Sequence, residues 1–215
     1  MVIPEPVMQA ISLLNQSGYE AYLVGGCVRD AVMHIPPHDY DLTTSATPSE
    51  MQKVFAAFRT IETGLKHGTL TVLMDEYPLE ITTFRLDGEY LDNRHPKEVI
   101  FNRKLDNDLS RRDFTINAMA YHPDEGLVDL FGGQKDCAEK IVRCVGDAST
   151  RFEEDALRIL RALRFAARLQ FAIEKRTASA IFDKKELLHH ISVERIAVEL
   201  NGLLLADGAV PILEQ

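Results

Sequence analysis

The chain has 215 residues, 46% hydrophobic and 27% charged, which fits a globular protein with one large core or a catalytic domain with a helical extension. No apolar run approaches the roughly 20 residues that cross a membrane, and the N-terminus lacks a signal-peptide pattern, so we expect a cytoplasmic protein without membrane contact. The net charge of −9 argues against a protein that coats nucleic acid, although a locally basic cleft would suffice for one RNA end.

The first half of the chain alternates helical and strand patterns. Apolar residues at helical spacing, a capping box at Thr47 and Glu50, and short buried runs between turns predict a mixed α and β domain. The expected helices cover residues 4–15, 27–33 and 48–58, and the expected strands cover residues 21–24, 40–43, 60–62, 69–74 and 79–84. The polar, aperiodic segment 86–97 is expected to be a mobile loop.

Strand patterns end near Thr150, which forms a second expected capping box with Glu153. Helices are predicted over residues 151–168, 174–189 and 192–205. The sequence therefore predicts an α+β fold with a boundary near residue 147, giving domains 1–147 and 148–215.

Asp39-Tyr40-Asp41 is the first candidate for chemistry. Alternate residues of a strand point to one face, so both carboxylates would converge, and a hard divalent cation would offset their charge. The alternative is a pair of exposed turn residues at a strand end. Glu80 lies in an expected strand between apolar Leu79 and Ile81, so it should face away from them as a third carboxylate or as a solvated position.

Gly25-Gly26 follows an expected strand and precedes an expected helix that contains Arg29. Glycines permit close backbone approach, and a helix N-terminus and an arginine both favour an anion, so this turn is a candidate triphosphate site. A simple tight turn is the alternative. For His34 and His38, the intervening Pro36-Pro37 argues against a helical zinc site, and the three cysteines lack CxxC spacing.

Several ordered motifs resemble those of the class II tRNA nucleotidyltransferase and bacterial poly(A) polymerase family. They are GGCVRD (25–30) with DYD (39–41), RRDFTINAMAY (111–121), DLFGGQKD (129–136), EEDALRILRALRF (153–165) and VERIAVEL (193–200). The resemblance implies a polymerase-β-like nucleotidyltransferase head with a five-stranded mixed sheet, followed by an all-helical neck. The helical body and tail domains of the family have no counterpart in the sequence.

The resemblance also implies roles for individual residues. Asp39 and Asp41 would be Mg²⁺ ligands, with Glu80 as a third carboxylate, and Gly25, Gly26 and Arg29 would hold the triphosphate. Arg112, Asp113 and Asn117 would handle ribose and phosphates, the glycines at 132 and 133 would form a hinge, and segment 86–97 would help to switch between C and A addition.

Asp155 and Arg158 stand at i and i+3 of an expected helix and would share a face. Asp accepts from an exocyclic amino group while Arg donates to a ring nitrogen, which suits cytosine and in part adenine. The resemblance implies this base-selecting role, and a surface ion pair is the alternative. Arg161 would contact phosphate or RNA, unless it belongs to a solvated face.

The sequence thus predicts a template-independent enzyme that adds C and/or A to the 3′ end of tRNA from CTP and ATP with magnesium. A poly(A) polymerase is the alternative within the family, and the net charge of −9 counts against processive RNA tailing. A non-catalytic nucleotide- or RNA-binding module is the alternative from another class.

Overall fold

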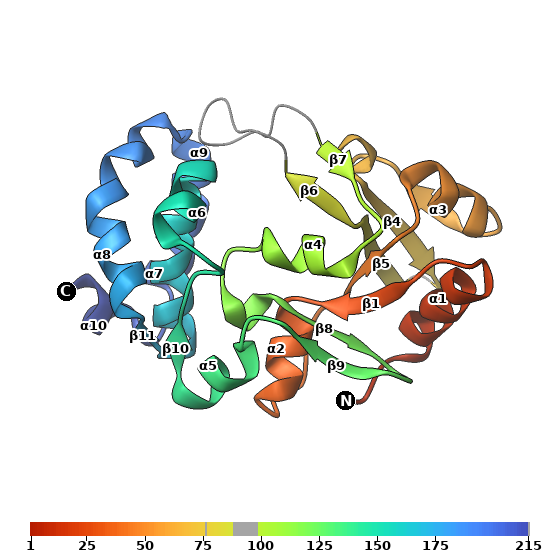
Figure 1. Cartoon of the computed structure of the whole chain (residues 1–215), viewed down its shortest axis with the longest axis horizontal. Coiled ribbons are helices and arrows are strands. Elements are labelled where there is room, and N and C mark those ends of the chain that lie inside the picture. Colours follow the sequence, from red (N-terminus) through yellow and green to blue (C-terminus); the bar gives the residue numbers. More distant parts are fainter. Residues whose placement is uncertain (76, 88–98, 215) are drawn as a thin grey trace. The chain divides into compact units, whose positions relative to one another are not determined.

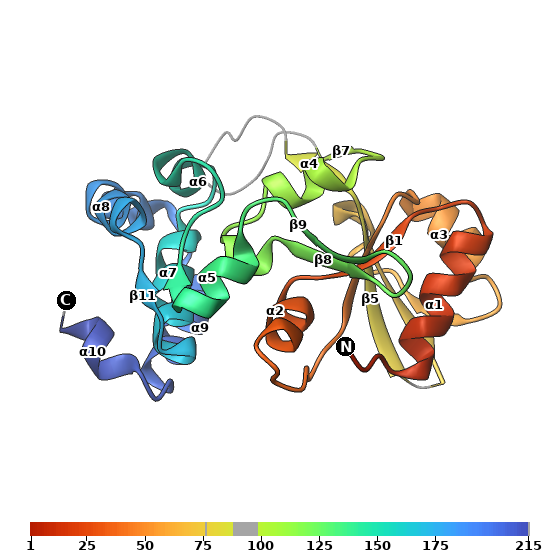
Figure 2. The ribbon, with the colours of Figure 1, turned by 60° about the horizontal axis from the view of Figure 1, so that its bottom comes forward.

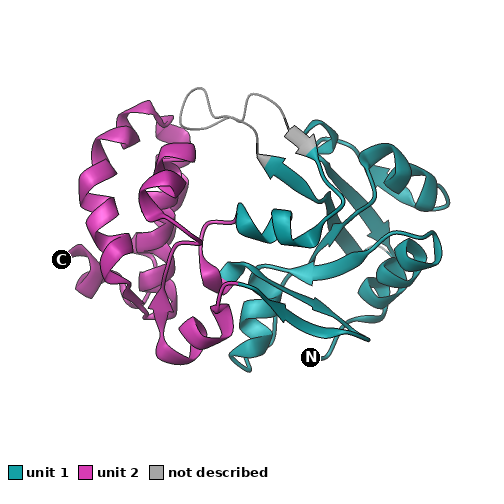
Figure 3. Cartoon of the chain, in the orientation of Figure 1, with its two compact units in different colours: residues 1–87, 99–111, 117–130 teal, residues 88–98, 112–116, 131–215 magenta. Residues whose placement is uncertain are grey.

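A computed structural model describes residues 1–75, 77–87 and 99–214 of the chain. The chain divides into two compact units, which are coloured separately in Figure 3. The first unit comprises residues 1–87, 99–111 and 117–130, and the described part of the second comprises residues 112–116 and 131–214. None of the described helices combines the length and apolarity that a bilayer crossing demands.

A sheet of seven described strands forms the centre of the first unit (Figure 1). Its order is β3-β4-β5-β2-β1-β8-β9, and the pairing is antiparallel except between β2 and β5, which run parallel. The strands are β1 (Ala21–Val24), β2 (Asp41–Thr44), β3 (Arg59–Ile61), β4 (Thr69–Met74), β5 (Tyr77–Thr83), β8 (Met119–His122) and β9 (Gly126–Asp129). The expected mixed sheet is confirmed, whereas the expected number of five strands is wrong, since the sheet has seven.

Helices α1 (Glu5–Gln16) and α3 (Pro48–Val54) contact each other and β4, while α2 (Gly26–Val32) contacts β1 and β8 (Figure 2). Strand β1 is buried along its whole length, whereas β4 contributes every second residue to the core. In β4, Leu70, Val72 and Met74 are buried and the intervening residues are partly exposed. One row of side chains therefore enters the core and leaves the alternate row open to the opposite side of the strand. Helix α4 (Leu105–Ser110) and the 3₁₀ turns η1 (Leu65–His67) and η2 (Thr115–Asn117) complete the ordered segments.

The predicted elements of this unit agree closely with the structure. Strands β1 and β4 have the predicted bounds, and the capping box of Thr47 and Glu50 is confirmed. β2 begins one residue later than expected, so Asp39 precedes the strand. The expected loop over residues 86–97 is wrong at its start, because β6 (Arg85–Asp87) pairs with β7 (Val99–Phe101), and residues 88–97 lie outside the described residues.

The described part of the second unit is helical apart from two short strands. Its helices are α5 (Gly133–Glu139), α6 (Ala148–Glu154), α7 (Leu157–Leu169), α8 (Lys175–Lys184), the 3₁₀ helix η3 (Lys185–His190), α9 (Val193–Leu204) and α10 (Ala209–Leu213). β10 (Ile141–Val142) pairs in parallel with β11 (Ala172–Ile173), so the expectation of no strand after residue 150 is wrong at β11. β10 pairs with β11 and contacts α5 and α7, so residues 131–147 belong to the second compact unit. The domain boundary near residue 147 stays a prediction.

The single helix expected over residues 151–168 is interrupted. Asp155 has an extended backbone with φ −142° and ψ 103°, and it separates α6 from α7. The expected capping box of Thr150 and Glu153 is also wrong, because Thr150 lies inside α6. Helix α6 is capped instead by Asp147, whose side chain accepts a 2.9 Å hydrogen bond from the Thr150 amide.

Candidate active site

Two carboxylates are direct neighbours in the sheet of the first unit. Asp41 of β2 is paired in register with Glu80 of β5, and paired residues project from the same face of a sheet. Both side chains are exposed, whereas Leu79 and Ile81 beside Glu80 are fully buried. The prediction that Glu80 faces away from its apolar neighbours is therefore confirmed.

These carboxylates open into one cavity with Asp39. The cavity has a volume of about 420 Å³, and its described lining consists of His38, Asp39, Tyr40, Asp41, Thr71, Tyr77, Pro78 and Glu80. Asp39 precedes the first residue of β2, yet it faces the same cavity as Asp41. The structure thus brings together the three carboxylates that the sequence singled out for a metal site.

The carboxylate cavity could receive a hard cation. Across residues 1–75, 77–87 and 99–214, no three His, Cys, Asp or Glu side chains form a ready-made metal cage. Mg²⁺ does not require such a cage, because it is commonly held by one or two carboxylates and completes its shell with water and substrate phosphates. Exposed carboxylates on one cavity wall fit that mode of binding.

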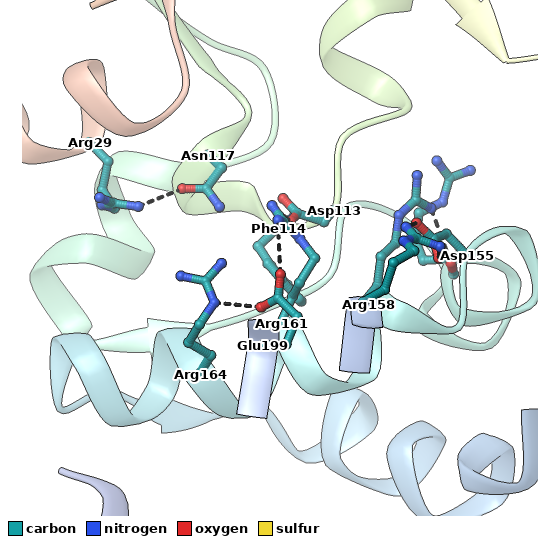
Figure 4. A network of polar contacts seen from close by, with 11 residues as sticks. Arg29, Asp113, Phe114, Asn117, Asp155, Arg158, Arg161, Arg164 and Glu199 are labelled. Atoms are coloured by element: carbon teal, nitrogen blue, oxygen red, sulfur yellow. Dashed lines mark hydrogen bonds and ion pairs between the residues drawn. The ribbon is translucent and has the colours of Figure 1, made fainter. Parts of the chain in front are cut away.

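The glycine turn follows β1, whose last residue, Val24, is paired with Asp41 of β2. Gly25 ends β1 with φ 77°, a left-handed backbone that favours glycine, and it is the N-cap of α2, whose first residue is Gly26. Arg29 of α2 is 5% exposed and donates a 2.9 Å hydrogen bond to the side-chain oxygen of Asn117 (Figure 4). Arg29 also contacts Asp30 at 2.7 Å. The residues predicted to bind phosphate and ribose are therefore in direct contact within this unit.

In the second unit, Asp113 and Arg161 form a partly buried ion pair. The Asp113 Oδ2 atom accepts hydrogen bonds from Arg161 Nε at 2.9 Å and Nη2 at 2.7 Å, while Oδ1 accepts from the Phe114 amide. Burial by itself raises the pKa of the Asp113 carboxyl, but the charge and hydrogen bonds of Arg161, the Phe114 amide and the charge of Arg158 together hold the pKa below its ordinary value. The Asp113 charge in turn raises the pKa of Arg161. Arg112 is half-buried beside this pair.

Glu199 of α9 connects Arg161 with a second arginine of α7. Its carboxylate is buried and is paired with Arg164 Nε, as Figure 4 shows, and with Arg161 Nη1 at 3.8 Å. The Arg164 guanidinium lies 4.4 Å from the centre of the Phe165 ring. Arg161, for which a solvated face was the alternative to a phosphate or RNA contact, is instead partly buried and paired with the carboxylates of Asp113 and Glu199.

Asp155 and Arg158 are also placed in the second unit, but they do not share a helix face. The expected i,i+3 arrangement is wrong, because Asp155 lies between the helices, where its carboxylate accepts a 3.1 Å hydrogen bond from the Leu157 amide. Asp155 is paired with Arg195 at 2.9 Å, and Arg158 is buried and paired with Glu154. Arg158 also donates to the Arg151 carbonyl at 3.0 Å.

Sequence reasoning assigned no role to Arg195 or Glu199. Both stand in VERIAVEL (193–200), a stretch whose resemblance to a family motif was noted without a role for any residue. Their i,i+4 spacing on α9 could have indicated that the two side chains act together, since it places both on one face of the helix.

Comparison with known proteins decides the family. A model described as the poly A polymerase head domain matches residues 21–143, which is more than half of the chain. The chain belongs to the poly A polymerase head-domain family. A second model, described as a probable RNA and SrmB-binding site of polymerase A, matches residues 170–215. The family resemblance predicted from the ordered motifs is thereby confirmed.

Members and structural neighbours of the family cover nearly the whole chain. The CCA-adding enzyme of Enterococcus faecalis is 47% identical over 213 residues, which are 97% of this chain and 51% of that enzyme. The crystal structure of the Bacillus stearothermophilus CCA-adding enzyme in complex with CTP has a TM-score of 0.90 and 41% identity, covering 98% of this chain and 51% of that one. A tRNA nucleotidyltransferase complexed with a primer tRNA and an incoming ATP analog has a TM-score of 0.77 and 31% identity, covering 95% and 58%. The chain spans about half the length of the curated relatives it matches.

Proposed function

We propose that this chain carries the catalytic part of a template-independent RNA nucleotidyltransferase that adds C and/or A, as CCA or its terminal A, to the 3′ end of tRNA. CTP and ATP would be the substrates, and pyrophosphate would be released. The observation that carries the proposal is the gathering of Asp39, Asp41 and Glu80 around one cavity. Relatives named CCA-adding enzymes, one of them crystallised with CTP, support the choice of substrates.

Asp39 and Asp41 would hold Mg²⁺, with Glu80 as a neighbouring carboxylate. Their oxygen atoms suit a hard cation, and the cavity leaves room for the substrate phosphates that complete its coordination. When bound, such an ion supplies charge neutralisation of the phosphates and favours ionisation of the attacking 3′-hydroxyl. The pairing of β2 with β5 holds Asp41 and Glu80 side by side before the substrate binds.

The triphosphate would lie along the turn at Gly25 and Gly26, whose backbone a phosphate can approach closely. Arg29 would exchange its hydrogen bond with Asn117 for one with phosphate, since a charged acceptor binds a guanidinium more strongly than an amide oxygen does. Asn117 would then be released to contact the ribose. Arg112 and Asp113 would likewise handle ribose and phosphates, with Arg161 holding Asp113 in place.

Base selection would rest on Asp155 and Arg158, with the Asp155 carboxylate accepting from the exocyclic amino group and Arg158 donating to a ring nitrogen. Uracil and guanine present the wrong groups for this pair. Arg195, which is paired with the Asp155 carboxylate at 2.9 Å, would orient that carboxylate. We place nucleotidyl transfer in domain 1–147 and base selection in the neck, domain 148–215, and we expect both to work in the cytoplasm.

One assay separates this function from its alternatives. The protein is incubated with Mg²⁺ and tRNAs that end before CCA, after C or after CC, and each labelled nucleotide is offered in turn. Addition of C followed by A supports the proposal, while A addition without limit would favour a poly(A) polymerase, in line with the description of the family model. A folded chain that binds CTP but incorporates nothing would be a binding module.

A further inference from the structure

A second cavity of the first unit lies at the end of β1 that is opposite the glycine turn. Its volume is about 250 Å³, and its described lining consists of Asn15, Gly18, Tyr19, Glu20, Ala21, Tyr22, His122 and Glu125. β1 begins in this lining at Ala21 and ends at Val24, the register partner of Asp41. The two cavities have no described lining residue in common, so the carboxylate site does not account for this one.

The described lining of this second cavity carries negative charge without a matching cation. It contains the exposed carboxylates of Glu20 and Glu125, and it contains no Lys or Arg. His122 adds no positive charge in this arrangement, because its Nδ1 atom accepts a 3.2 Å hydrogen bond from the Asp124 amide and an accepting ring nitrogen carries no proton. A cation that enters the cavity therefore meets two carboxylates and no like charge among these residues.

The two carboxylates lie close to a buried aromatic ring. The Tyr22 hydroxyl donates a 2.9 Å hydrogen bond to Glu125 Oε2, and the Tyr22 ring packs edge-on against the His122 ring with 5.5 Å between the ring centres. Burial raises the pKa of Tyr22, and the hydrogen bond and charge of Glu125 and the charge of Glu20 raise that pKa further. Both carboxylates are therefore near enough to the Tyr22 hydroxyl to act on it electrostatically.

Tyr19 gives the same cavity an aromatic residue that solvent can reach. Tyr19 is partly exposed, whereas Tyr22 is buried. The face of a tyrosine ring attracts organic cations, while a small metal ion needs several oxygen ligands at fixed distances. Among the residues that the structure describes, no group of three His, Cys, Asp or Glu side chains could hold a metal ion. The combination of aromatic rings with two carboxylates thus favours an organic cation over a metal ion.

We propose that this cavity binds a linear alkylammonium cation, such as a short diamine, with its charge near Glu20 and Glu125 and its alkyl chain against Tyr19. The volume of about 250 Å³ is slightly below the roughly 300 to 1,000 Å³ of usual ligand sites, which suits a slender chain. The inference does not depend on the proposed function, because the carboxylate cavity shares none of these lining residues.

Heteronuclear magnetic resonance of the isotope-labelled chain tests the site. The probe is hexamethylenediamine, its uncharged match is hexamethylene glycol, and salt at about 0.15 M screens long-range attraction to the acidic chain. Nucleotide and Mg²⁺ are omitted. We expect the diamine to cause saturable shifts of the amide signals of residues 18–22 and 122–125, and the glycol to cause none. Shifts scattered over other acidic segments, equal shifts with both compounds, or no shift at these residues would overturn the inference.

Variants test the contribution of each group to diamine binding. Glu125→Gln keeps the size of the side chain and removes its charge, so it should raise the Kd for the diamine by about three-fold or more. Tyr19→Leu should raise the Kd by a similar factor through loss of the ring, and Tyr19→Phe should restore the wild-type value. Glu5→Gln, at an exposed glutamate of α1, is the matched control and should bind like wild type.

Equal affinity in Glu125→Gln and Glu5→Gln would overturn the site, and the amide spectrum of each variant checks that it is folded. The transfer assay gives a separate result. Glu125→Gln should add C at the wild-type rate, because Glu125 lies outside the carboxylate cavity. A wild-type chain that binds the diamine but transfers no nucleotide would reject the proposed function and leave this site standing.

Discussion

Asp41 and Glu80 are register partners in the parallel pair of strands β2 and β5, so two carboxylates that are distant in sequence lie next to each other on one face of the sheet. Such like charges are stable together when solvent or a cation offsets their repulsion. Their cavity contains Asp39 as a third acidic wall residue. The predicted metal site follows directly from this strand register.

Metal binding should depend on nucleotide and on both aspartates. We expect paramagnetic Mn²⁺, used as a probe for the Mg²⁺ site, to bind the wild-type chain more tightly when CTP is present, because phosphates supply further oxygen ligands. Asp41→Asn should weaken this binding by at least about ten-fold, as expected from the loss of a charged ligand. Electron paramagnetic resonance of free Mn²⁺ measures the effect, and equal binding in wild type and variant would reject the site.

Selection of the base should be relaxed by changes at the break between α6 and α7. Asp155→Ala or Arg158→Ala should reduce the preference for CTP over UTP by about ten-fold or more, since a matched pair of base contacts contributes roughly 1 to 3 kcal/mol of discrimination. Arg195→Ala should act in the same direction through the position of Asp155. The measurement is kcat/KM for each nucleotide, with the exposed Arg168→Ala on α7 as control. Unchanged discrimination against UTP would show that selection lies elsewhere.

The partly buried pair of Asp113 and Arg161 should stabilise the second unit. Asp113→Ala should lower the free energy of unfolding by about 1 to 3 kcal/mol, less than for a fully buried pair, because the Arg161 side chain is 34% exposed. Urea denaturation at neutral pH measures the change, and the exposed Asp183→Ala on α8 is the control. A variant as stable as wild type would mean that the pair serves only substrate binding.

The capping box at the start of α3 should make stability depend on pH. Hydrogen bonds from the Thr47 backbone and the Arg103 side chain lower the pKa of Glu50 from 4.5 to about 2. Because the folded-state pKa is the lower one, the stabilisation is fully present above about pH 4.5 and is lost as the pH falls toward about 2. Glu50→Ala should therefore be less stable by about 1 kcal/mol at neutral pH, the usual size of a capping contribution. Urea titrations at pH 7, 4 and 3 should show this difference narrowing, and a constant difference would contradict the assignment.

Local patterns predicted several strands and the glycine turn of the first unit well. Strand β1, the glycine turn and the alternation around Glu80 follow from residue type and the two-residue period of a strand, which act over a few positions. The pairing of strands that are distant in the sequence was harder to predict. The register of β2 and β5 depends on distant pairing, and the hairpin of β8 and β9 within the resembling motifs was not predicted as strands at all.

The second unit shows why a helix pattern alone is insufficient. The residues around Asp155 include many strong helix formers and no glycine or proline, so intrinsic propensity predicts one continuous helix. The break accompanies interactions that the pattern does not contain, namely the bond from the Leu157 amide to the Asp155 side chain and the ion pair with Arg195. The predicted base-selecting role of Asp155 depended on its i,i+3 spacing from Arg158 on one helix, yet Asp155 lies outside the helices.

The most direct test of the central proposal is single-turnover addition of labelled C to a tRNA lacking CCA, with Mg²⁺, by the wild-type chain and by Asp39→Ala and Asp41→Ala. Circular dichroism establishes that the variants are folded. We predict that the wild-type chain adds C and that each variant loses transfer while keeping its fold, because the exposed carboxylates contribute little to the core. Transfer at the wild-type rate by either folded variant would contradict the carboxylate site.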